Sequence, residues 1–176
     1  MTNSHWSYPL YRLVWSGLDW LFPPRCGGCG KAGSRWCDEC QGKVPVLAGR
    51  LCEKCGLPVF RESLCERCRI NPPPYRAQRA WAAFDFPVRQ ALHKLKYRRD
   101  MGLGDALAAP LARFTESLSW PLEVVLPVPL GQKRLRERGY NQVDLIARPL
   151  SLALGLNYRP AALKRKRETA SQVGLS

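Results

Sequence analysis

The spacing of hydrophobic residues after residue 75 predicts two amphipathic helices. Pro87 suits the first turn of a helix, because proline lacks the N–H that this turn leaves unpaired. The apolar positions that follow recur at helical spacing: Val88, Ala91, Leu92 and Leu95. A second helix is expected at residues 103–118, with a stripe that faces the core: Leu103, Leu107, Leu111 and Phe114. Before these helices, the sequence at residues 79–84 predicts a strand.

A continuous apolar run at residues 124–128 predicts a buried parallel strand that ends in a proline-rich turn. A basic, glycine-containing loop follows, and then a helix whose apolar positions extend to Leu154. Residues 158–163 are a further strand candidate. A strand, a basic loop at its carboxyl end and a helix form the arrangement in which α/β folds place anionic ligands. The pattern thus predicts an α/β domain with a parallel sheet.

We expect four segments along the chain. These are an N-terminal helix at 1–22, a cysteine-rich double ribbon at 23–70, a stiff proline-rich linker at 71–76 and the α/β domain at 77–176. Residues 7–22 are apolar only in patches and lack the cleavage site of an export signal. No stretch approaches the ~18 unbroken apolar residues of a membrane-spanning helix. The sequence therefore predicts a cytoplasmic protein with reduced thiols and no membrane span.

All eight cysteines fall within residues 26–68, as four CxxC pairs in a repeated arrangement. Seven residues separate the first two pairs, and nine separate the last two. Each CxxC turn supplies two soft metal ligands from one knuckle. Gly30 and Gly56 follow the leading knuckles, where a positive φ lets a backbone N–H reach a thiolate. The first candidate quartet is Cys26, Cys29, Cys37 and Cys40, and the second is Cys52, Cys55, Cys65 and Cys68.

This spacing predicts two Zn²⁺ ions with structural roles, because four cysteine ligands leave no open position for water. Each unit is too small to bury a core and is held by metal instead. Redox dithiols or disulfides are the alternative, but redox CxxC motifs usually occur singly on a strand–helix unit. Sequential pairing of the knuckles closes shorter loops than interleaved pairing, although this entropic advantage grows only slowly with loop length. Both pairings therefore stay open.

The formal net charge of +14 indicates an anionic partner. Two zinc ions bound by eight thiolates would lower this charge to about +10, which is still strongly basic. Nucleic acid, phosphorylated metabolites and anionic membrane surfaces all remain candidates. Trp36, Phe60 and Tyr75 are able to stack nucleobases, but packing within the small ribbons is the simpler role for them. His93 is interpreted as a polar position on a basic helix.

Four motifs then occur in a recognisable order: the paired CxxC ribbons, LKYRRD, VVLPVPLGQKRLRERGYNQ and RETASQ. From about residue 21 to residue 176 the chain resembles the ComF family of zinc-ribbon, type I phosphoribosyltransferase-like proteins. The resemblance implies that residues 129–139 handle pyrophosphate. The phosphate-binding candidates that it implies are Arg134, Arg138, Asn141, Gln142, Lys164 and Arg165. It also implies Mg²⁺, but only in a complete site for phosphoribosyl pyrophosphate.

The sequence departs from the family pattern near its last residue. The family continues with a strand that ends in two acidic residues and with a Thr-Thr-Gly loop for the 5-phosphate, whereas this sequence stops at Ser176 inside the flexible-loop region. We therefore expect a truncated, incomplete phosphoribosyltransferase-like parallel α/β domain, without catalytic residues or transfer activity. A sheet that lacks its neighbours is poorly covered, so the region from Tyr75 onward is expected to be marginally stable.

Three functions stay open at this point. The first is a phosphoribosyltransferase-like protein associated with DNA uptake and competence, inactive as a transferase in this form. The second is a non-enzymatic module that binds single-stranded DNA or a partner of the competence machinery, with an affinity for DNA that falls steeply as salt rises. The third is a truncated product with no present function.

Overall fold

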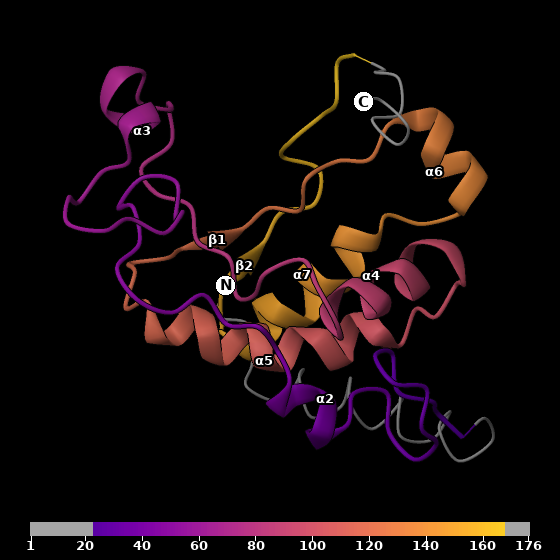
Figure 1. Cartoon of the computed structure of the whole chain (residues 1–176). Helices are drawn as coiled ribbons and strands as arrows, with labels where there is room; N and C mark the ends of the chain where they lie inside the picture. Colours follow the sequence, from indigo (N-terminus) through magenta and orange to yellow (C-terminus); the bar gives the residue numbers. More distant parts are fainter. Residues whose placement is uncertain (1–22, 168–176) are drawn as a thin grey trace, which may run out of the picture.

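The computed structural model describes residues 23–167, and Figure 1 labels its helices and strands. The expected N-terminal helix at residues 1–22 lies outside this range, as does the RETASQ motif from residue 168 onward. Within the range, no helix is both long and apolar enough to cross a bilayer. The described chain is a mixed structure of helices and two short strands, with two cysteine-rich ribbons at its N-terminal end.

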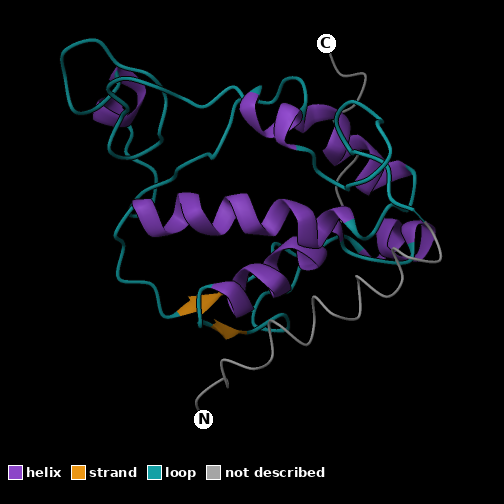
Figure 2. Ribbon diagram, turned by 90° about the horizontal axis from the view of Figure 1, so that it is seen from below, coloured by secondary structure: helices purple, strands orange, loops and turns teal. Residues whose placement is uncertain are grey.

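Three helices form the body of the molecule: α4 (Val88–Tyr97), α5 (Leu103–Ser117) and α7 (Gln142–Ala153). The helix α5 runs through the centre and packs most extensively against α7 (Figures 1 and 2). This packing is close, because a Cβ on Gly104 would lie 2.5 Å from the backbone oxygen of Leu145. The buried hydrophobic residues of these helices include Val88, Ala91, Leu95, Leu103, Leu107, Ala108, Ala112 and Ala147. The helices expected after Pro87 and at residues 103–118 are confirmed, with α5 ending one residue earlier.

Two short strands, β1 (Val124–Val125) and β2 (Asn157–Tyr158), pair in parallel, with Val124 opposite Asn157. The connection between them carries α6 (Gln132–Arg138) and α7, which makes a parallel β–α–β unit. The hydroxyl of Tyr158 donates a hydrogen bond to Asp144 on α7, so β2 is tied to the helix that packs on both strands. The strand β1 lies within the apolar run at 124–128, and β2 overlaps the candidate at 158–163 only at Tyr158. Both strands are much shorter than expected.

The strand predicted at residues 79–84 is wrong, because this segment is irregular and its polar groups bind the ribbons. The N–H of Ala83 donates to the carbonyl of Pro45 at 2.9 Å. The guanidinium of Arg79 donates to the carbonyls of Cys52 and Glu53, at 3.3 and 3.0 Å. The segment therefore links the ribbons to the helices instead of extending the sheet.

The first ribbon, which ends in α2 (Asp38–Gly42), packs directly on the helical body. Lys94 of α4 donates to the carbonyl of Cys26 at 2.9 Å, and Arg35 forms an ion pair with Asp100 at 3.3 Å. The fit is tight, since a Cβ on Gly27 would lie 2.5 Å from a methyl group of Leu103 on α5. The first ribbon and the helices are therefore one packed unit.

The second ribbon, which ends in α3 (Glu66–Ile70), stands apart from the helices in both Figure 1 and Figure 2. The proline-rich linker folds back on this ribbon: Lys54 donates to the carbonyl of Tyr75 at 3.1 Å. The N–H of Gln78 donates to the carbonyl of Lys54 at 2.7 Å. The linker is thus part of the second ribbon's surface and does not simply separate the ribbon from the helices.

Candidate metal centres and basic surface

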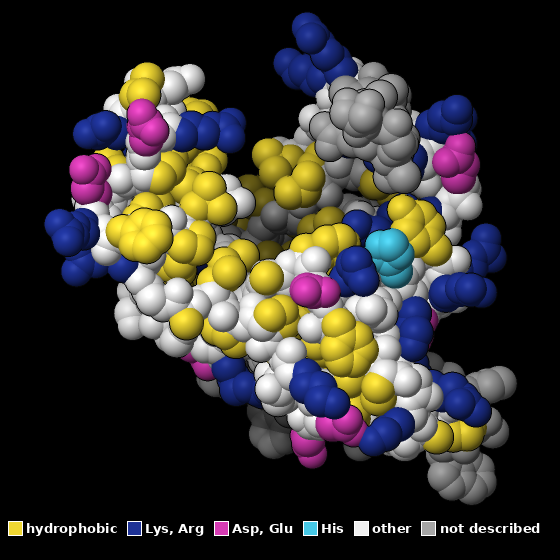
Figure 3. Space-filling model, viewed as in Figure 1, with side chains coloured by type: hydrophobic (Ala, Val, Ile, Leu, Met, Phe, Trp, Pro, Cys, Tyr) yellow, Lys and Arg dark blue, Asp and Glu magenta, His cyan; other side chains and the backbone are white. Residues whose placement is uncertain are grey.

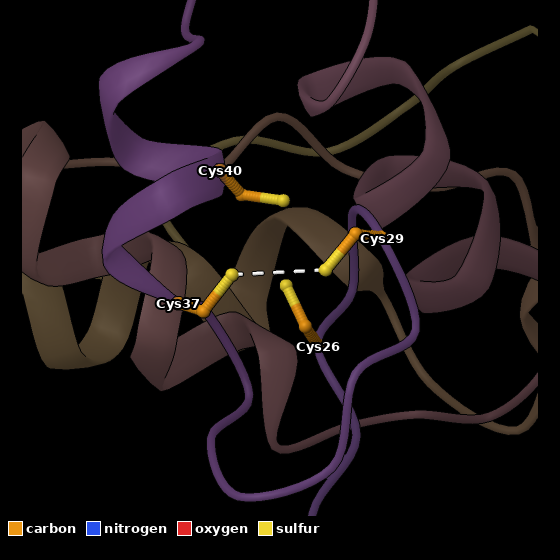
Figure 4. A group of neighbouring side chains, drawn as sticks. All are labelled: Cys26, Cys29, Cys37 and Cys40. Carbon is orange, nitrogen blue, oxygen red and sulfur yellow. Dashed lines mark hydrogen bonds between the residues drawn. The ribbon is translucent and has the colours of Figure 1, made fainter.

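The first four cysteines of the chain converge on one point. Cys26 and Cys29 come from the leading knuckle, Cys37 precedes α2, and Cys40 lies on α2 (Figure 4). All four Sγ atoms lie within 4.8 Å of one another, and those of Cys29 and Cys37 are 3.7 Å apart. Cys26 and Cys40 are buried, whereas Cys29 is exposed.

The last four cysteines form a second group with the same design. The Sγ atoms of Cys52, Cys55, Cys65 and Cys68 also lie within 4.8 Å of one another. Those of Cys55 and Cys65 are 3.6 Å apart. Each group therefore contains two consecutive CxxC pairs, so the pairing that the sequence left open is sequential and not interleaved.

Both groups fit a tetrahedral zinc site. Four sulfur atoms at the usual Zn–S distance of about 2.3 Å are separated by ~3.8 Å in a regular tetrahedron. The measured separations of 3.7 and 3.6 Å are close to this value. A zinc ion held by four thiolates has no free coordination position. It would stabilise the ribbon and would not activate water.

The electrostatic environment differs between the cysteines of each group. Burial opposes ionisation of Cys26, but backbone N–H groups, first that of Cys37, lower its pKa to about 6. Hydrogen bonds from the backbone of Cys55 and Cys65 likewise lower the pKa of Cys52 to about 6. Burial instead raises the pKa of Cys40 and raises that of Cys68 to about 12. Metal binding therefore has to release protons from the buried thiols, which couples affinity to pH.

The glycines after the leading knuckles have the expected left-handed backbone, with φ of 83° at Gly30 and 72° at Gly56. Their N–H groups donate to the carbonyls of Cys26 and Cys52, both at 2.9 Å, and not to thiolates. The N–H of Cys65 donates to the sulfur of Cys52 at 3.3 Å instead. The glycines therefore close the knuckle turns.

The basic segment after β1 contains the helix α6, so the loop that the sequence pattern predicted there is wrong. Its residues between Gly131 and Gly139 are mostly strong helix formers, and Gly139 ends the helix in the left-handed conformation, with φ of 85°. None of the residues of α6 is buried. The helix thus presents its arginines at the surface, where Figure 3 shows basic side chains in dark blue.

Arg138 connects α6 to the C-terminal end of α4. Its guanidinium lies 5.5 Å from the ring centroid of Tyr97, and it also donates a hydrogen bond to the side chain of Gln142. The hydroxyl of Tyr140 donates to the carbonyl of Leu95 at 2.5 Å. Arg134 lies one turn before Arg138 on α6 and is half-buried. Two of the six phosphate candidates, Arg138 and Gln142, are thus in direct contact.

The remaining candidates have different surroundings. The side chain of Asn141 caps α7 by accepting from the N–H of Val143 at 3.1 Å, and its amide group donates to the carbonyl of Val128 at 3.0 Å. Asn141 is therefore held in a structural role. Lys164 and Arg165 are exposed beyond β2, and Arg165 donates to the carbonyl of Arg167 at 3.0 Å.

Sequence reasoning missed a row of ring contacts on α4. The rings of Phe84 and His93 are 6.2 Å apart, and those of His93 and Tyr97 are 5.7 Å apart. The sequence signal for these contacts was the four-residue spacing of His93 and Tyr97, which places two side chains side by side on a helix. The ring of Trp36 in the first ribbon lies 6.3 Å from that of Trp81, which belongs to the segment before α4 and not to a ribbon as expected. Phe60 is fully exposed. The packing role predicted for Phe60 is therefore wrong.

The two cysteine groups and the ribbons around them define a double zinc-ribbon protein. A family model described as a double zinc ribbon domain matches residues 17–69. Together with the relatives described below, this match supports the resemblance to the ComF family. No solved structure matches the chain.

The relatives carry names that refer to DNA utilization or to competence. The chain is 38% identical over 133 residues to "DNA utilization protein YhgH" of Shigella flexneri, covering 72% of this chain and 58% of the relative. It is 37% identical over 152 residues to the protein of that name in Salmonella typhimurium, covering 81% and 66%. It is 26% identical over 151 residues to "Competence protein ComFC" of Bacillus subtilis, covering 78% and 62%. The chain thus spans less than two thirds of the length of these relatives.

Proposed function

We propose that this chain is a zinc-stabilised module that binds DNA through its phosphates and serves DNA uptake or utilisation. The observation that carries the proposal is the contact of Arg138 with Tyr97, which joins the basic helix α6 to the basic end of α4. Arg98 borders the same pocket as Tyr97, so cations from the end of α4 and from α6 lie on one surface. The names of the relatives, which refer to DNA utilization and competence, support the same function.

The two zinc ions have a structural role in this proposal. Each cysteine group offers four sulfur ligands, which suits Zn²⁺ and leaves it no position for a substrate. The first ion would hold the ribbon that Lys94 joins to α4. Zinc would therefore support the DNA-binding surface indirectly, by fixing the helix that carries it.

Fluorescence anisotropy with a labelled single-stranded oligonucleotide tests the proposal. If phosphate contacts dominate, affinity falls by a factor of about 10³ or more between about 50 and 200 mM salt for six or more contacts. Arg134→Ala and Arg138→Ala should each weaken binding and reduce the salt slope by about one. Arg113→Ala, at an exposed position of α5, is the matched control and should change neither. Absent or salt-insensitive binding would refute the proposal.

A phosphoribosyltransferase-like ligand site is the second candidate. It is favoured by the parallel pairing of β1 and β2, because basic residues that follow β1 lie where such units hold anions. The ligand would be a phosphorylated sugar diphosphate, and Mg²⁺ would accompany the diphosphate in a complete site. Isothermal titration with phosphoribosyl pyrophosphate tests for binding. A turnover assay tests our expectation that these 176 residues transfer nothing.

A further inference from the structure

Three aromatic side chains form an exposed row beside the basic residues of α4. Phe84 precedes α4, while His93 and Tyr97 lie one turn apart on it. The ring centroids of Phe84 and His93 are 6.2 Å apart, and those of His93 and Tyr97 are 5.7 Å apart in an edge-to-face arrangement. Arg138 of α6 extends the row, with its guanidinium 5.5 Å from the Tyr97 ring. This surface is therefore built by the helices α4 and α6 together with the segment that precedes α4.

The row is accessible to a ligand. Phe84 is 58% exposed and Tyr97 is 62% exposed, and His93 is also exposed. Figure 3 shows the only histidine among residues 23–167 in cyan, with hydrophobic and basic side chains around it on the surface. Large aromatic rings are usually buried for much of their area, and neighbouring exposed rings often mark a binding surface.

Cations lie beside the aromatic row. An open pocket of about 500 Å³ is lined by Arg89, Gln90, His93, Lys94, Tyr97 and Arg98. Lys94 is engaged with the carbonyl of Cys26, whereas Arg89 and Arg98 are exposed. The pocket thus offers positive charge for phosphates and ring surface for bases.

We propose that Phe84, His93 and Tyr97 stack the bases of single-stranded DNA, while Arg89, Arg98 and Arg138 contact its phosphates. This inference rests on the proposed DNA-binding function. It adds that the site selects single-stranded DNA over a duplex. Aromatic rings beside a cationic groove bind single strands with little sequence preference, because every base has a face to stack. In a duplex the bases are already stacked and paired, so they offer no free face on which the three aromatic rings can stack. Charge complementarity with the phosphates supports the same ligand.

The experiment compares two strands of equal length and charge. One is a single-stranded oligonucleotide of mixed sequence, and the other is an abasic strand with the same phosphates. The variants Tyr97→Leu and Phe84→Leu, in zinc-loaded protein, remove ring faces at exposed positions. Each should weaken binding of the base-containing strand by about fivefold or more and leave binding of the abasic strand unchanged. Phe60→Leu, at a fully exposed ring on the second ribbon, is the control and should affect neither strand.

A fluorescent base analogue adds an independent signal. 2-Aminopurine placed in the strand should change its emission on binding to the wild-type chain, and this change should shrink in Tyr97→Leu. Equal affinity of the wild type for both strands would overturn the stacking site but leave phosphate binding intact. The site would also be overturned if the row variants weakened both strands equally, or if Phe60→Leu alone weakened binding. Failure of the wild type to bind either strand would overturn the proposed function itself.

Discussion

Asn141 shows how one side chain takes on a role that its motif did not reveal. The family resemblance made it a phosphate candidate, but both of its polar atoms are used within the chain. Its Oδ1 accepts from the N–H of Val143, and its Nδ2 donates to the carbonyl of Val128. It therefore caps α7 and ties that helix to the segment after β1.

Replacing Asn141 with Ala should destabilise the protein by about 1–2 kcal/mol, because the cap of α7 is lost. Urea unfolding followed by circular dichroism measures the change in the free energy of unfolding. Asn157, which is exposed on β2, provides the matched control, and Asn157→Ala should stay within about 0.5 kcal/mol of the wild type. A large loss of DNA affinity in Asn141→Ala at unchanged stability would contradict this structural role.

At the scale of the elements, the two ribbons differ in how they are connected. The first ribbon packs so closely on the helices that a Cβ on Gly28 would lie 2.6 Å from Pro87 Cβ and from Cys40 Sγ. The second ribbon is joined through Arg79 and the linker. The metal in the first ribbon should therefore stabilise the helical body, whereas the metal in the second should stabilise mainly its own ribbon.

The variants Cys29→Ser and Cys55→Ser separate these two roles, since each removes one ligand from one group. Cys29→Ser should lower the free energy of unfolding of the helices by about 2 kcal/mol or more, as expected for the loss of a structural metal. Cys55→Ser should change it far less. Native mass spectrometry gives the metal count, and hydrogen exchange at α4 and α5 gives the local stability. Equal loss of protection at these helices in both variants would show that the ribbons act as one unit.

The contact of α5 with α7 depends on a glycine. A Cβ on Gly104 would lie 2.5 Å from the backbone oxygen of Leu145, and a backbone atom cannot move aside as a side chain can. Gly104→Ala should therefore force the helices apart and destabilise the protein by about 1–3 kcal/mol. Gly42→Ala is the control, because nothing lies within 4 Å of a Cβ at the end of α2. Thermal melts of both variants measure the difference, and a Gly104→Ala protein as stable as the wild type would exclude close helix packing here.

At the scale of the whole molecule, the sheet and the segment that follows β1 are poorly covered. The sheet has two short strands, and the apolar side chains of Val124, Leu126 and Val128 are 43%, 39% and 65% exposed. The helices, in contrast, bury their apolar residues against each other and against the first ribbon. Because burial of apolar area is the main stabilising term, the region that contains the sheet contributes little to stability.

We therefore expect these 176 residues to unfold from Tyr75 onward at low urea or with a shallow slope. For a small, fully cooperative domain the slope is about 1–3 kcal/mol per molar urea, since it scales with the surface exposed on unfolding. Circular dichroism and tryptophan fluorescence, measured together, show whether the transitions coincide. One cooperative transition of normal slope by both probes would contradict marginal stability.

The sequence by itself determined the features that depend on residues close together in the chain. The CxxC spacing predicted both cysteine groups, because a knuckle turn brings two ligands together whatever surrounds it. Apolar spacing predicted α4, α5 and α7, since one buried stripe is enough to define an amphipathic helix. The parallel strand at β1 was found for a similar local reason, although its length was overestimated.

Tertiary structure decided everything that depends on distant residues. Sequential and interleaved cysteine pairing differ only slightly in loop entropy, so the packing of each ribbon had to distinguish them. The segment at residues 79–84 satisfies a strand pattern, yet its polar groups bond to Pro45, Cys52 and Glu53. The aromatic row on α4 is completed by Phe84, which precedes the helix, and is extended by Arg138 of α6. Local spacing specifies which elements form, whereas long-range hydrogen bonds and packing specify what those elements place side by side.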